Sequence, residues 1–120
     1  MQNRDLAEYL FCNVEEISSM KTYKYKVTIE GDVHFPKCFL EHLTKVPMVS
    51  VAPQKFEGEL TLAVNGNLDY DIEVTAITGT AWSATIKNVD VNKKVLELSD
   101  KKTGAKIPNF SKENGQVNPD

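Results

Sequence analysis

The chain has 120 residues, of which 41% are hydrophobic and 26% are charged, and its net charge is −3 at pH 7. This length fits one domain with its own core, and the composition is not that of a disordered chain. The mild acidic charge gives no general attraction to phosphate backbones or anionic lipid, and no apolar run is long enough for a membrane-spanning helix.

The first residues lack the basic-then-apolar layout of a secretory signal. We therefore expect a cytoplasmic protein with no membrane partner. Its two cysteines, Cys12 and Cys38, are then expected to stay reduced. In a mature secreted fragment, a disulfide between them is the only pairing available.

An amphipathic helix is predicted at the start of the chain. Leu6, Leu10, Val14 and Ile17 recur at helical spacing, which puts them on one face. Asn13 begins a capping-box pattern and leaves open a second, shorter helix at this point. Either arrangement needs a sheet against which the apolar stripe can pack.

Residues 22–30 form the clearest single strand. Apolar and polar side chains alternate, so one row faces inward and the other faces outward. The inward row is Tyr23, Tyr25, Val27 and Ile29, and the outward row is Thr22, Lys24, Lys26 and Thr28.

A short second helix is predicted over residues 36–45. Pro36 suits a first helical position, the apolar residues that follow make a short stripe, and Pro47 ends the helix.

Three alternating stretches, residues 58–64, 68–76 and 82–88, predict an antiparallel meander. A three-residue loop over 65–67 keeps the apolar groups on one face and puts Asn67 in the left-handed region. It pairs Val64 with Leu68 and Leu62 with Tyr70.

By the same reasoning a loop over 77–79 puts Gly79 in the left-handed region and Trp82 opposite Val74. A third loop, over 90–92, brings Leu96 opposite Ile86 and Leu98 opposite Ala84.

The predicted fold is α+β. We expect an antiparallel β-meander of five to six strands that forms a half-open barrel or curved sheet, covered by the N-terminal helix and the short second helix. Residues 1–110 are expected to form this single domain. Residues 111–120 offer little to bury beyond Val117 and are expected to be a flexible C-terminal tail.

The polar face of the predicted sheet is acidic, and it is the favoured protein-binding surface. Complementary charge speeds association, so this face suits a basic partner. A straight strand spreads its carboxylates too far apart for a calcium site. The proposed contact residues are Glu57, Glu59, Asp69, Asp71 and Glu73.

A single-stranded nucleic-acid-binding, OB-like module is the alternative. Such modules combine aromatic stacking platforms with a cationic groove. The candidate residues are Tyr23, Lys24, Tyr25, Lys26 and Trp82.

A third reading is a zinc-stabilised domain. Zinc takes four thiol and imidazole ligands, and four such residues fall in the first part of the chain, although their spacing matches no compact zinc finger. They are Cys12, His34, Cys38 and His42. Cysteine–histidine catalysis by Cys38 and His42 lacks a placed orienting group.

No phosphate loop, nucleophile elbow or paired-cysteine motif is present in the sequence, which leaves no reaction to propose. We therefore expect a non-enzymatic binding protein without a cofactor, of the inhibitor, immunity, anti-defence or assembly-accessory type. Its partner is expected to be another protein, and a homo-oligomer is left open.

Overall fold

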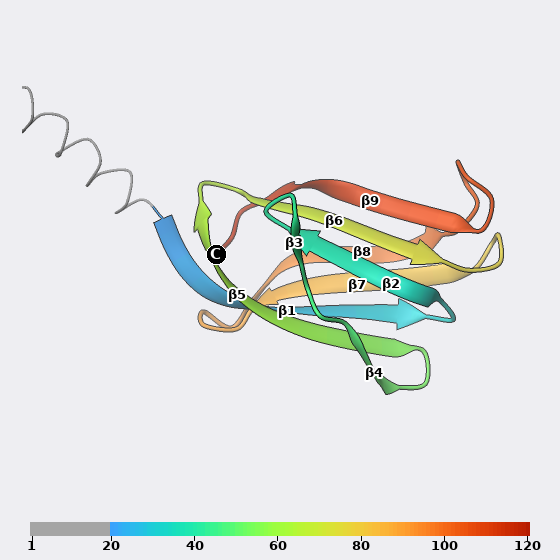
Figure 1. Cartoon of the computed structure of the whole chain (residues 1–120), viewed down its shortest axis with the longest axis horizontal. Coiled ribbons are helices and arrows are strands. Elements are labelled where there is room, and N and C mark those ends of the chain that lie inside the picture. The colour runs from blue at the N-terminus through green and yellow to red at the C-terminus, as the bar shows by residue number, and fades with distance from the viewer. Residues whose placement is uncertain (1–19) are drawn as a thin grey trace, which may run out of the picture.

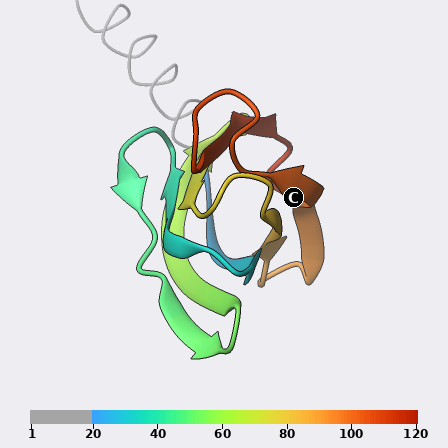
Figure 2. The same cartoon turned by 90° about the vertical axis from the view of Figure 1, so that its right-hand side faces the viewer.

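The computed structural model describes residues 20–120, and every regular element in them is a β-strand. The strands form two antiparallel sheets, here called sheet A and sheet B. Sheet A has the order β4–β5–β1–β7–β8, with bounds Val49–Ala52, Lys55–Asn65, Met20–Gly31, Ala81–Asn88 and Lys93–Lys102. Sheet B has the order β3–β2–β6–β9, with bounds Thr44–Lys45, His34–Leu40, Leu68–Thr75 and Phe110–Val117. The strands run along the long axis (Figure 1), and the end-on view shows them around one interior (Figure 2).

One hydrophobic core lies between the two sheets. β1 is the central strand of sheet A, and its inward residues Tyr25, Val27 and Ile29 have no exposed surface. Sheet B contributes Leu40 and Ile72, which are equally buried. Each such side chain contributes roughly 1.5–3 kcal/mol through burial, so the core holds the two sheets face to face.

The predicted α+β fold is wrong, because residues 20–120 contain no helix and form two sheets. The predicted second helix, 36–45, is instead β2, a turn and β3. Cys38 and Leu40 alternate with outward neighbours in β2, and Pro36 falls at a bulge where its missing N–H breaks no ladder. The predicted N-terminal helix lies outside the described residues.

The predicted meander is also wrong, since β5 and β7 belong to sheet A and β6 belongs to sheet B. β5 pairs with β1, so Leu62 lies opposite Tyr23 rather than Tyr70. The loop over 65–67 crosses between the sheets, and Gly66 rather than Asn67 has the positive φ. Alternation of apolar and polar residues shows which side of a strand is buried, but not which strand lies beside it. Consecutive strands on opposite sides of one core show the same alternation as consecutive strands of one sheet.

Other sequence predictions are confirmed. The inward and outward rows of residues 22–30 are those of β1. β7 and β8 form the expected hairpin, with Ile86 opposite Leu96 and Ala84 opposite Leu98. Gly79 adopts a positive φ of 94°, as its loop requires.

Residues 111–120, expected to be a tail, contain most of β9 and a return of the chain onto the core. β9 pairs with β6 along its whole length. The carbonyl of Pro119 accepts hydrogen bonds from Tyr25 Oη at 3.3 Å and from Asn88 Nδ2 at 2.8 Å. These bonds satisfy two buried polar groups, so the end of the chain is part of the packed structure.

The core predicts a large difference in stability between alanine substitutions at Ile86 and at Ile77. Ile86→Ala removes a fully buried side chain and should lower the free energy of unfolding by about 2–5 kcal/mol. Ile77→Ala, the matched control, changes a side chain that is 82% exposed and should stay within about 0.5 kcal/mol of the wild type. Urea unfolding followed by the fluorescence of Trp82 measures both. Equal losses would contradict this core.

Alkaline pH should destabilise the fold through Tyr25. Burial, assisted by the nearby Tyr23 and Asp120, raises the pKa of Tyr25 to about 12. The pKa of a tyrosine in the unfolded chain is about 10. The stability that neutral Tyr25 contributes is therefore complete below that pH, and it is lost as the pH rises towards about 12. Tyr25→Phe removes this titration, and its free energy of unfolding should fall less steeply over that range. Parallel curves for variant and wild type would refute the assignment.

Candidate functional site

The five acidic residues expected to form one binding surface are divided between the two sheets. Glu57 and Glu59 lie on the outer face of sheet A, on β5, whereas the other three lie on the outer face of sheet B, on β6. The core separates these faces. The acidic residues therefore do not form one contact surface.

On sheet A the acids are paired across strands with lysines of β1. Lys26 Nζ lies 2.7 Å from Glu57, and Lys24 Nζ lies 2.9 Å from Glu59. The hydrogen bond from Lys26 lowers the pKa of Glu57, with a further contribution from Lys55. Exposed pairs of this kind stabilise a sheet only slightly, but they neutralise the face.

On sheet B, two of the three acids are also paired. Asp69 lies 2.9 Å from His42 Nε2, and Asp71 lies 3.4 Å from Lys112 Nζ. Glu73 lies opposite Lys37 on β2 and Lys112 on β9 in the strand register. The acidic residues on β6 thus lie beside basic side chains of their own chain.

The residues of the nucleic-acid alternative do not form a stacking platform. Tyr25 is fully buried, Trp82 is 2% exposed, and both face the core. Lys24 and Lys26 are on the opposite face of β1 and are held by the acids of β5. A base could reach these two rings only if the core opened.

The described part of the metal-ligand set is dispersed. His34 lies at one end of β2, and Cys38 faces the core. His42 lies beyond the other end of β2, where its Nε2 contacts Asp69. Cys12 is outside the described residues. Within residues 20–120, no group of three or more histidine, cysteine, aspartate or glutamate side chains is placed to hold a metal ion.

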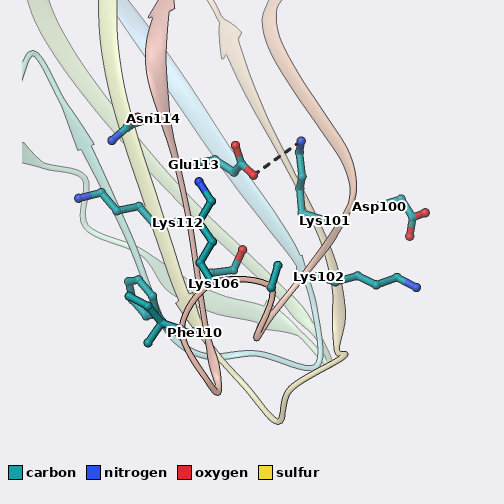
Figure 3. A pocket seen from close by; sticks show the side chains of 11 residues that line it. Asp100, Lys101, Lys102, Lys106, Phe110, Lys112, Glu113 and Asn114 are labelled. Carbon is teal, nitrogen blue, oxygen red and sulfur yellow. Dashed lines mark ion pairs between the residues drawn. The ribbon is translucent and has the colours of Figure 1, made fainter.

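A groove lies between the free edges of the two sheets and is lined by several charged side chains. We call it the β8–β9 groove; its volume is about 510 Å³. Figure 3 shows Lys101 of β8 and Glu113 of β9 facing each other across it, 3.7 Å apart. Its lining is Asp100, Lys101, Lys102, Ala105, Lys106, Ile107, Phe110, Ser111, Lys112, Glu113 and Asn114.

The groove is basic, with four lysines and two carboxylates in its lining. Lys101 is paired with Glu113, and Lys112 is paired with Asp71 outside the groove. Lys102 and Lys106 are exposed and have no ion-pair partner among residues 20–120. The local charge is therefore opposite in sign to the net charge of the chain.

Hydrogen bonds hold the loop 103–109, which forms one end of the groove. Thr103 Oγ1 donates to the carbonyl of Ile77 at 2.6 Å, and Gly79 N donates to the carbonyl of Thr103 at 2.8 Å. Asn109 N donates to Thr78 Oγ1 at 2.9 Å. This bonding fixes the loop in advance, which lowers the entropy lost when a ligand binds.

Three lysines of this groove stand out in the sequence, but the groove itself does not. Lys101, Lys102 and Lys106 stand close together in the sequence, and that clustering was the available signal. The opposite wall is β9, which the sequence does not reveal as a strand. Without it, the lysines cannot be assigned to one site.

A scan against protein-family models found no matching family, and searches of curated proteins and of solved structures found no significant match. No helix in residues 20–120 is long and apolar enough to cross a membrane.

The placement of Cys38 predicts an unreactive thiol. Burial, together with the charge of Asp71, raises the pKa of Cys38 to about 12. The pKa of a free cysteine is about 8.5, so Cys38 has roughly a thousandfold less thiolate at neutral pH than a free cysteine. In a Cys12→Ser background, iodoacetamide should label Cys38 far more slowly in the native protein than in urea, as measured by mass spectrometry. Equal labelling rates would contradict the burial of Cys38.

Proposed function

We propose that the protein is a non-catalytic interaction domain that binds an acidic, extended segment of a partner protein in the β8–β9 groove. The observation that carries the proposal is the pair of unpaired lysines, Lys102 and Lys106, beside apolar side chains at two free sheet edges. A partner with surplus carboxylates supplies what this groove lacks.

The free strand edges support an extended partner. β8 is the last strand of sheet A and β9 is the last strand of sheet B, so each has one edge without a strand neighbour among residues 20–120. Such an edge presents unpaired backbone N–H and C=O groups. An extended peptide binds to such an edge by adding a strand, and its alternate side chains provide the specificity.

The charge of the groove supports an acidic partner. Opposite charges accelerate encounter and select against wrong partners. The acids on β5 and β6 mostly have basic side chains of the same chain beside them, whereas Lys102 and Lys106 have no carboxylate partner among residues 20–120. The partner's expected charge is therefore acidic rather than basic.

Apolar side chains in the groove would add binding affinity to the electrostatic attraction of an acidic partner. Ile107 is 56% exposed and Phe110 is half-buried, and both lie beside the lysines. Interfaces derive most of their affinity from a few such side chains, which are desolvated on binding. An acidic segment with interspersed apolar residues fits both features.

The proposal can be tested with an acetylated decapeptide of alternating Glu and Val. The fluorescein-labelled peptide should bind the wild-type protein, and Lys102→Glu/Lys106→Glu should raise its Kd at least about tenfold, because two attractive charges become repulsive. The matched control is Lys45→Glu/Lys87→Glu, which makes the same change in net charge at exposed positions away from the groove. The control should retain the wild-type Kd.

Two outcomes would overturn the proposal. Equal weakening by both double variants would mean that only the overall charge matters. Preferential binding of an oligothymidylate with the same number of negative charges would assign the groove to nucleic acid instead.

A further inference from the structure

A second concave site lies on the outer face of sheet B, on the far side of β9 from the groove. We call it the β6 hollow; its volume is about 330 Å³. Six outward side chains from β2, the following turn, β6 and β9 define it: Phe39, His42, Asp69, Asp71, Asn114 and Gln116.

A strained turn builds one wall of the hollow. Glu41 and His42 have φ values of 51° and 70°. These values lie in the left-handed region, which residues other than glycine seldom adopt. Asp69 N donates to Glu41 Oε1 at 2.9 Å, and Glu41 N donates to the carbonyl of Asp69 at 3.0 Å. This turn brings His42 to Asp69. Strain of this kind costs about 1–3 kcal/mol per residue and concentrates at ligand sites.

The hollow offers planar hydrogen-bonding groups in adjacent pairs. Asn114 lies opposite Asp71, and Gln116 lies opposite Asp69, in the register of β6 and β9. Neither carboxamide has a side-chain hydrogen-bond partner among residues 20–120. Asp71 Oδ1 is buried and likewise has no partner in the described part of the chain. Rotation of this carboxylate would present that oxygen to a donor in the hollow.

Both carboxylates of the hollow already have a partner on their own chain. His42 Nε2 lies 2.9 Å from Asp69, and Lys112 Nζ lies 3.4 Å from Asp71. Phe39 contributes an aromatic ring, half-buried on β2. A neutral ligand with many hydroxyls and an apolar face fits this combination.

We propose that the β6 hollow binds a neutral saccharide. Each sugar hydroxyl both donates and accepts a hydrogen bond, and the carboxylates accept while the carboxamides do both. A few polar groups that fix orientation beside an aromatic surface are typical of small-ligand sites. The C–H face of a pyranose ring lies on Phe39 and its hydroxyls meet Asp71, Asn114 and Gln116. This proposal does not rest on the acidic partner proposed for the groove.

The test is a titration of ¹⁵N-labelled protein with maltohexaose, cellohexaose, xylohexaose and chitohexaose, followed by two-dimensional NMR. At least one of them should shift the backbone amides of residues 39–42, 69–71 and 114–116 with a Kd in the millimolar range or below. Phe39→Leu and Gln116→Ala should each weaken that binding at least about tenfold. Phe35→Leu is the matched control, since Phe35 is on the same strand, is 79% exposed and lies outside the hollow; it should leave the Kd unchanged.

The inference is overturned if none of the four saccharides shifts these amides, or if Phe35→Leu weakens binding as much as Phe39→Leu does. Shifts caused by hexa-arginine but not by the saccharides would assign the hollow to a basic peptide. Phe39 and Gln116 do not line the β8–β9 groove, so these results do not depend on the acidic-peptide experiment. Unchanged spectral dispersion in each variant establishes that it is folded.

Discussion

The architecture depends on one constraint: the strands that build the core each have one apolar row, and the rows from the two sheets must share a single core. Tyr25, Val27 and Ile29 at the centre of sheet A meet Leu40 and Ile72 of sheet B there. Once these rows face each other, the polar rows point in opposite directions. The separation of the acidic residues into two faces, and the exposure of the edges at β8 and β9, both follow from this packing.

The inward rows of β1, β5, β6 and β7 could be predicted from the sequence, but the neighbours of these strands could not. Leu62 and Tyr70 were expected to be a cross-strand pair, and both do face the core, yet they belong to different sheets. Apolar residues at every second position show that one side of a strand is buried. A single-sheet meander and a two-sheet fold both have this pattern, so it does not distinguish them. The hairpin between β7 and β8 was predictable because a short loop and a matching apolar row both specify it.

The site residues escaped prediction for a different reason. β9 has the sequence Phe-Ser-Lys-Glu-Asn-Gly-Gln-Val, which lacks the apolar alternation by which strands are recognised. Its strand conformation comes from backbone pairing with β6 along all eight residues. The second helix was mispredicted because Pro36 and a short apolar stripe fit a helix as well as they fit a bulged strand. In both segments tertiary pairing outweighs local pattern.

The polar sequence of β9 prevents its recognition as a strand, and it also leaves the outer face and the free edge of β9 accessible. Its outward residues form a wall of the β6 hollow, and its free edge forms a wall of the β8–β9 groove. Lys112 links the two sites, because it lines the groove and pairs with Asp71 in the hollow. A carboxylate in the groove that drew Lys112 towards it would leave Asp71 without its cation. If both proposed sites bind ligands, occupation of the groove would make the hollow more acidic, and each ligand would change the binding free energy of the other through Lys112.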